Sequence, residues 1–214
     1  MMRSSTQSWR QRHTVSVCLL MGYLVLALFA ITLALLLNPN TSETFFTELG
    51  RGVALTGFTL LILQVALSAR IKFVNRVFGL DVIMRFHKHM GIFAALLLIS
   101  HPVFLALGHG SWRLFSFGTG WRLNLGKVAM VVLLFTILFA LSFRSLRVSF
   151  KVWRFLHKGA ILIIVLGFIH ALVVGSDLEK MGMMIYFWAL SVMATGIFIY
   201  RNLFMPLLGH STKH

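Results

Sequence analysis

Nine histidines are present in this 214-residue sequence, and five of them lie in or at the ends of strongly apolar stretches. These five are His87, His89, His101, His157 and His170. An ionisable side chain in an apolar segment is costly to bury, so it indicates a function such as metal or haem ligation. One isolated histidine of this kind is equally explained by a neutral ring that hydrogen-bonds to a neighbouring helix. The spacing of the five distinguishes these interpretations.

Four of these histidines form two pairs with nearly equal spacing. His87 and His101 lie 14 residues apart, and His157 and His170 lie 13 residues apart. At 1.5 Å per residue, each pair spans roughly 20 Å along an α-helix. Two helices running in the same direction would then present two imidazoles at each of two depths. This is the geometry of two b-type haems stacked across a membrane, each held between facing helices by axial nitrogens.

The helical period tests this hypothesis. At about 100° per residue, fourteen residues end within about 40° of the starting face, so His87 and His101 share a face. The thirteen residues from His157 to His170 fall about 140° short of four full turns, so these two side chains would lie on different faces of a regular helix. The segment carrying His157 and His170 therefore requires overwinding, a kink or an oblique approach by one ring. Gly159 lies between these two histidines, where it would ease such a distortion.

The elements that hold these rings are predicted to be membrane-spanning helices. Apolar residues make up 58% of the chain and charged residues only 12%, against about 25% charged in a soluble domain. Lipid leaves only helices or closed barrels as spanning structures, and no period-2 alternation is present. We therefore predict an all-α integral membrane protein, a six-transmembrane-helix bundle binding two stacked b-type haems. The six apolar segments, each close to the roughly 20 residues that a bilayer core requires, cover approximately residues 14–37, 47–69, 82–107, 125–143, 155–174 and 182–204.

The basic residues predict the orientation of this single domain. Fifteen of the 20 Lys and Arg residues lie in the tails or around the connections after the second and fourth segments. The other five lie on the opposite side, together with four of the five acids. By the positive-inside rule, residues 1–13 and 205–214 are cytoplasmic tails that flank a membrane domain at residues 14–204. We expect a multi-pass protein of the cell (plasma) membrane with both termini cytoplasmic.

Several other classes of protein are excluded or less favoured, a transporter or channel among the latter. The one cysteine, Cys18, cannot build a disulfide scaffold, a Cys-based zinc or iron–sulfur site, or a C-x-x-C-H haem attachment. The isoelectric point near 11.5 is explained by membrane topology, so the expected surroundings are a lipid bilayer and not nucleic acid. A transporter or channel with a histidine proton relay would need acids inside the membrane, and none is evident. A purely structural subunit would leave the paired histidines unexplained.

Two motifs resemble the ferric reductase-like transmembrane domain shared by ferric reductases and NADPH oxidases. Arg85-Phe-His-Lys-His-Met-Gly91 leads to His101, and Trp153-Arg-Phe-Leu-His-Lys158 leads to His170. The start of the second segment at Arg51 is also similar. The resemblance covers nearly the whole chain, and the family spacing of paired histidines is met on both helices.

This resemblance implies which histidines hold which haem. His87 and His157 would be the axial ligands of the inner haem, and His101 and His170 those of the outer haem. On angular grounds His89 is the poorer ligand, because it lies about 120° from the face of His101. Both haem b groups would be non-covalent, and neither iron would bind oxygen or substrate directly because both axial positions are filled.

The implied function is transmembrane electron transfer from a cytoplasmic flavin/NAD(P)H reductase to an acceptor on the outer face, a ferric chelate or oxygen. The sequence holds no G-x-G-x-x-G, so FAD and NAD(P)H would act only through a missing domain or a flavin reductase partner. The chain is thus an oxidoreductase component. An alternative is a haem-binding membrane subunit that delivers electrons to a separate periplasmic reductase, such as a methionine-sulfoxide reductase.

Cations near the ligands would serve the buried haem propionates or the electron acceptor. Membrane topology or lipid contact explains each of them equally well. The residues concerned are Arg85, Lys88, Arg154 and Lys158 near the inner ligands and Arg51 near the outer ligands.

Overall fold

The computed structural model describes residues 2–37, 43–143 and 145–204. Every regular element in these ranges is a helix. Six stretches are long and apolar enough to cross a membrane, which confirms the predicted all-α integral membrane fold. Their helices are α1 (Met2–Leu37), α2 (Phe45–Ser68), α4 (Leu80–Gly108), α5 (Trp121–Ser142), α6 (Phe150–Lys158) followed by α7 (Ile161–Val174), and α8 (Met181–Ile199).

Shorter elements join the spanning helices. The helix α3 (Lys72–Phe78) was not expected from the sequence, and Gly79, with φ of 83°, joins it directly to α4. Glycine adopts this left-handed backbone without steric cost, which permits the sharp change of direction. The remaining short elements are η1 (Trp112–Phe115), η2 (Phe117–Thr119), η3 (Ser176–Glu179) and a π-helical turn, η4 (Tyr200–Phe204).

The first helix is longer than the apolar pattern indicates. It begins at Met2, whereas only Thr14–Leu37 has the hydropathy of a membrane span. Much of the stretch predicted as an N-terminal tail therefore continues the helix, because hydropathy marks where a helix enters lipid and not where it begins. The predicted C-terminal tail, residues 205–214, lies outside the described residues.

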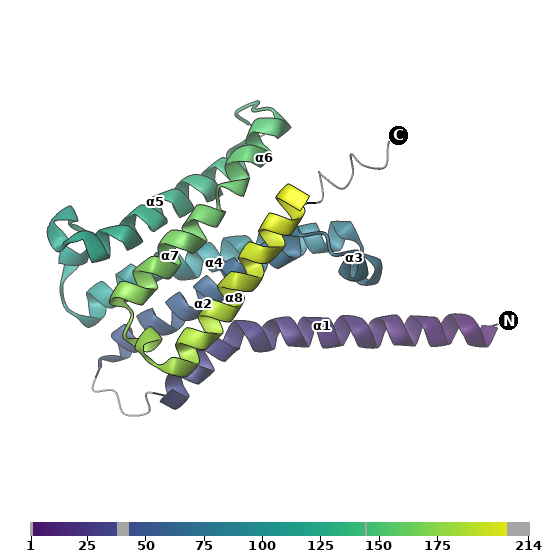
Figure 1. Ribbon diagram of the computed structural model, residues 1–214, viewed down its shortest axis with the longest axis horizontal. Coiled ribbons are helices and arrows are strands. Elements are labelled where there is room, and N and C mark those ends of the chain that lie inside the picture. Colours follow the sequence, from purple (N-terminus) through teal and green to yellow (C-terminus); the bar gives the residue numbers. More distant parts are fainter. Residues whose placement is uncertain (1, 38–42, 144, 205–214) are drawn as a thin grey trace.

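The central helix of the bundle is α2, which contacts α1, α4, α7 and α8 (Figure 1). In its most apolar window 56% of the residues are buried, against 11–22% in the other spans, so the others present most of their surface outward. A Cβ atom at Gly57 would lie 3.0 Å from Cβ of Leu97, and the buried Ala94 and Ala95 are on the same part of α4. Small residues thus bring the α2 and α4 backbones close together.

The fifth span is broken between α6 and α7, where the histidine spacing predicted a distortion. The backbone N–H groups of Gly159, Ala160, Leu162 and Ile163 each bond to the carbonyl three residues earlier. Such 3₁₀ bonding advances about 120° per residue instead of about 100°. The break therefore overwinds the chain in the direction that reduces the angular mismatch between the histidines on either side of it.

The connections separate into two groups at opposite ends of the bundle. In Figure 1 the start of α1, the helix α3 and the end of α8 lie toward one end. The end of α1 and the segments that join α4 to α5 and α7 to α8 lie toward the other. Because α4 starts at the first end and α7 finishes at the second, both helices run in the same direction, as the paired histidines require.

Candidate functional site

The rings of His87 and His157 lie beside each other at the start of α4 and the end of α6. Their centroids are 6.1 Å apart and their planes cross at 80°. Two imidazoles that bind one metal from opposite sides have centroids about 6 Å apart. Each metal–nitrogen bond is about 2 Å, and each nitrogen lies about 1 Å from the centre of its own ring. The Nδ1 atoms of both rings are buried without a hydrogen-bond partner. The separation of these rings therefore matches that of two axial ligands of a single iron.

The second pair, His101 and His170, lies further along α4 and α7. The two imidazoles are within electrostatic range of each other. His101 Nδ1 is 2.9 Å from the carbonyl oxygen of Gly50 on α2, and His170 Nδ1 is 3.2 Å from that of Arg122 on α5. A carbonyl only accepts, so Nδ1 carries the proton in each of these hydrogen bonds and Nε2 keeps its lone pair. This is how metal-binding histidines are usually oriented, with the second nitrogen donating to a backbone oxygen.

The position of His170 also depends on a glycine. A Cβ atom at Gly126 on α5 would lie 2.7 Å from Cε1 of His170 and 2.9 Å from its Nε2. Any side chain larger than a hydrogen would therefore push the imidazole out of place. The absence of a side chain at Gly126 allows the ring to pack directly on the α5 backbone.

The two pairs suit an iron porphyrin better than a bare metal ion. Among the described residues, no group of three or more His, Cys, Asp or Glu side chains could hold a metal ion. A porphyrin supplies four nitrogens of its own and needs two axial ligands from the protein. Imidazoles in pairs at two heights, one of each pair on α4 and the other on the α6–α7 span, are therefore the donor set that a haem requires.

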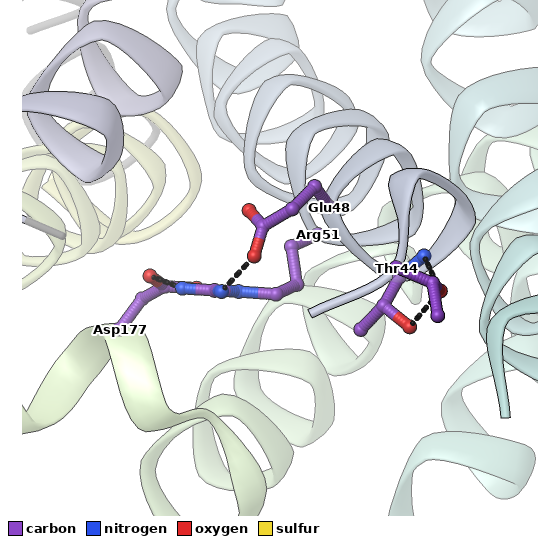
Figure 2. Close-up of polar contacts among 5 residues, drawn as sticks. Thr44, Glu48, Arg51 and Asp177 are labelled. Carbon is purple, nitrogen blue, oxygen red and sulfur yellow. Dashed lines mark hydrogen bonds and ion pairs between the residues drawn. The ribbon is translucent and has the colours of Figure 1, made fainter. Parts of the chain in front are cut away.

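Arg51 forms ion pairs with two carboxylates, those of Asp177 and Glu48. Its Nε lies 3.0 Å from Oδ2 of Asp177, its Nη2 binds Oδ1 of the same side chain, and its Nη1 lies 2.7 Å from Oε1 of Glu48 (Figure 2). Asp177 is only 5% exposed. The guanidinium thus ties α2 to η3, next to the Gly50 carbonyl that holds His101.

The four cations near the inner ligands are exposed, and in the described residues none of them pairs with an acid. The guanidinium of Arg154 lies 4.8 Å from the centre of the Phe150 ring, a cation–π distance. The set consists of Arg85, Lys88, Arg154 and Lys158.

His89 is separate from the paired histidines. It is exposed, and its Nδ1 lies 2.8 Å from the carbonyl oxygen of Arg85 on the preceding turn of α4. The ring of His89 therefore forms a hydrogen bond within α4, and its angular position on the helix had already indicated that it is the poorer ligand.

Sequence reasoning did not identify the groups that hold the rings. Gly50 and Arg122 act through backbone carbonyls, and a carbonyl function leaves no trace in residue type. Nothing in the sequence around Gly126 distinguishes it from the other glycines of the chain or indicates that His170 packs against it. Trp153 stacks on His157 and begins the motif that runs from Trp153 to Lys158. Its position one helical turn before the histidine is the signal in the sequence that indicates this contact.

A search of curated proteins found no match to this chain. The family described as the ferric reductase like transmembrane component matches residues 53–168, more than half of the 214 residues. The matched region includes His87, His101 and His157 and stops two residues before His170. The chain therefore belongs to the ferric reductase-like transmembrane family.

Proposed function

We propose that this chain carries electrons across the plasma membrane through two b-type haems. His87 and His157 hold the inner haem, and His101 and His170 hold the outer haem. Electrons enter from a flavin reductase domain or protein on the cytoplasmic side and leave to an acceptor on the outer face. Ferric chelates and oxygen are the acceptors that suit this outer-sphere chemistry.

The observation that carries this proposal is the pairing of four imidazoles at two heights. His87 and His101 are separated by about 21 Å along α4. The imidazole of His157 lies beside that of His87, and the imidazole of His170 is within electrostatic range of that of His101. One isolated histidine is explained by a polar contact in the core. Two pairs on two helices, with Nε2 available in the outer pair, are explained by ligation.

Held by these two histidine pairs, each haem would supply reversible one-electron chemistry. The protein keeps His101 and His170 in one tautomer through the carbonyls of Gly50 and Arg122. Fixed rings need little reorganisation when the charge beside them changes. The buried side chains of Leu133, Ile164 and Phe168 belong to the apolar core of the bundle, which keeps water away from the path between the two pairs.

The proposed direction follows from charge. The connections expected on the cytoplasmic side carry the exposed cations, including Arg85 and Lys158, and these side chains favour an approach by an acidic electron donor. Arg51 on the opposite side is neutralised by its two carboxylates. Nicotinamide and flavin chemistry is assigned to a further domain or to a partner protein.

Two measurements on the detergent-solubilised chain and on liposomes test this function. Extraction with acid acetone and a pyridine haemochrome assay should give two non-covalent haems per chain. In liposomes that enclose an acceptor, with the cytoplasmic face outward, dithionite or an added flavin reductase should reduce the enclosed acceptor, whereas NAD(P)H alone should not. A chain without haem, or one that transfers no electrons to the interior, contradicts the proposal.

A further inference from the structure

Two parallel rings lie at the end of α6. The indole of Trp153 and the imidazole of His157, one helical turn later, have centroids 5.2 Å apart and planes only 8° apart. The indole is itself held in place by two phenylalanine rings. Phe150 lies 5.0 Å away at 21°, and Phe143, at the end of α5, lies 5.0 Å away at 31°. The orientation of the indole is therefore fixed by elements on both sides of the α5–α6 connection.

In the part of the chain that the structure describes, no hydrogen bond to Nδ1 fixes the plane of the His157 imidazole. Its Nδ1 is buried without a hydrogen-bond partner, whereas Nδ1 of His101 and of His170 each meet a backbone carbonyl. The terminal torsion of a histidine side chain is broad, so the ring turns unless something holds it. At His157 the stacked indole takes the place of the missing hydrogen bond.

Trp153 is not explained as a membrane-interface anchor. Tryptophan in that role directs its N–H toward the headgroups and water. The Nε1 atom of Trp153 is instead buried and has no hydrogen-bond partner. The contact that the indole makes is therefore the one between its flat face and the His157 ring. Leaving its N–H buried without a partner costs free energy, which this stacking must offset.

The plane of His157 determines how the two inner rings cross. His87 and His157 meet at 80°, and Trp153 lies within 8° of the His157 plane. We propose that Trp153 is the positioning residue of the inner pair, holding the His157 imidazole perpendicular to that of His87. The proposal rests on the proposed function, because the crossing angle has a chemical consequence only when both rings bind one iron.

That consequence can be measured. Parallel axial imidazoles interact with the same iron d orbital and separate it in energy from its partner, whereas crossed imidazoles act on the two orbitals equally. A low-spin ferric haem with crossed rings therefore gives a more anisotropic EPR spectrum, with a larger maximum g-value. The crossing angle of 80° predicts a spectrum of this crossed-ring type for the inner haem.

The experiment uses the full chain with His170→Ala, which removes one ligand of the outer haem and leaves the inner haem as the low-spin species. Haem content, visible spectra and low-temperature EPR spectra are recorded for this parent and for Trp153→Phe, Trp153→Leu and Trp112→Leu in the same background. Trp112 is 60% exposed in η1 and is the matched control. The parent and the control should show the same large maximum g-value.

Trp153→Leu should keep the haem but give a lower and broader maximum g-value, because the His157 ring is then free to turn. Trp153→Phe, with a smaller flat face, should give an intermediate value. If the leucine variant loses the haem, the phenylalanine spectrum decides: a shifted signal supports the proposal, and an unchanged signal overturns it. A parent signal of the parallel-ring type also overturns it. A chain that binds no haem even without these substitutions contradicts the proposed function itself.

Discussion

Nδ1 of His101 on α4 lies 2.9 Å from the carbonyl oxygen of Gly50 on α2, 51 residues earlier in the chain. The same relationship joins His170 on α7 to Arg122 on α5, 48 residues earlier. Each outer histidine is thus oriented by the first part of a neighbouring helix, and not by its own. In the inner pair the Nδ1 atoms of His87 and His157 are buried without hydrogen-bond partners, and only the His87 ring comes within reach of a neighbouring backbone, that of Gln64 on α2. The outer rings are thus held by hydrogen bonds, and the His157 ring by packing.

The two haem sites should be separable by mutation. On the proposed function, His170→Ala removes one axial ligand of the outer haem and leaves His87 and His157 untouched, 6.1 Å apart. We expect haem content to fall from two toward one per chain, while the remaining haem is still reduced from the cytoplasmic side. Pyridine haemochrome assay and stopped-flow reduction in oriented liposomes measure both quantities. Loss of both haems from His170→Ala, while the helical content is unchanged, would show that the sites are not independent.

Gly126→Ala should act on the same site without removing a ligand. The new methyl group would lie 2.7 Å from Cε1 of His170, a distance at which the imidazole must move. Overpacking of this kind typically costs about 1–3 kcal/mol. We expect weaker binding of the outer haem, measured by titrating haem into the haem-free protein. Gly22→Ala is the control, because nothing lies within 4 Å of that position, and haem binding there should not change.

The two carboxylates of Arg51 should contribute unequally to stability. Asp177 is buried, and removing one partner of a buried ion pair typically costs about 3–5 kcal/mol. The Glu48 side chain is 32% exposed, and exposed pairs contribute about 0–1 kcal/mol. Asp177→Asn should therefore lower the thermal unfolding midpoint in detergent far more than Glu48→Gln. Equal shifts for the two variants would mean that the Asp177 pair is effectively solvated.

The sequence predicted the spans and the paired histidines because the length of an apolar run and the spacing of two residues can both be read along the chain. Apolar length located six spans, and spacing alone selected His87, His101, His157 and His170. The angular mismatch of the second pair also indicated that its helix must be distorted, and the 3₁₀ bonds around Gly159 provide that distortion.

Other features could not be predicted, because they depend on contacts between distant parts of the chain. Arg51 was interpreted as a possible contact of a propionate or an acceptor, and its pairing with Asp177, 126 residues away, was not predicted. The carbonyl of Gly50 and the close approach of Gly126 involve the backbone, which has the same chemistry at every residue. The helix α3 is only seven residues long, which is too short for periodicity to reveal.

The choice between the two neighbouring histidines on α4 provides the last prediction. His89 is exposed and its Nδ1 meets the carbonyl of Arg85, whereas His87 lies beside His157 with a buried Nδ1. His89→Ala should therefore retain two haems, and His87→Ala should lose the inner one while keeping the outer haem on His101. The two substitutions remove the same side chain two positions apart, so each controls for the effect of the other on the helix. Haem content and the amplitude of the reduced visible absorption band measure the result. Loss of a haem from the His89 variant, with both haems retained in the His87 variant, would show that the axial ligand on α4 is His89.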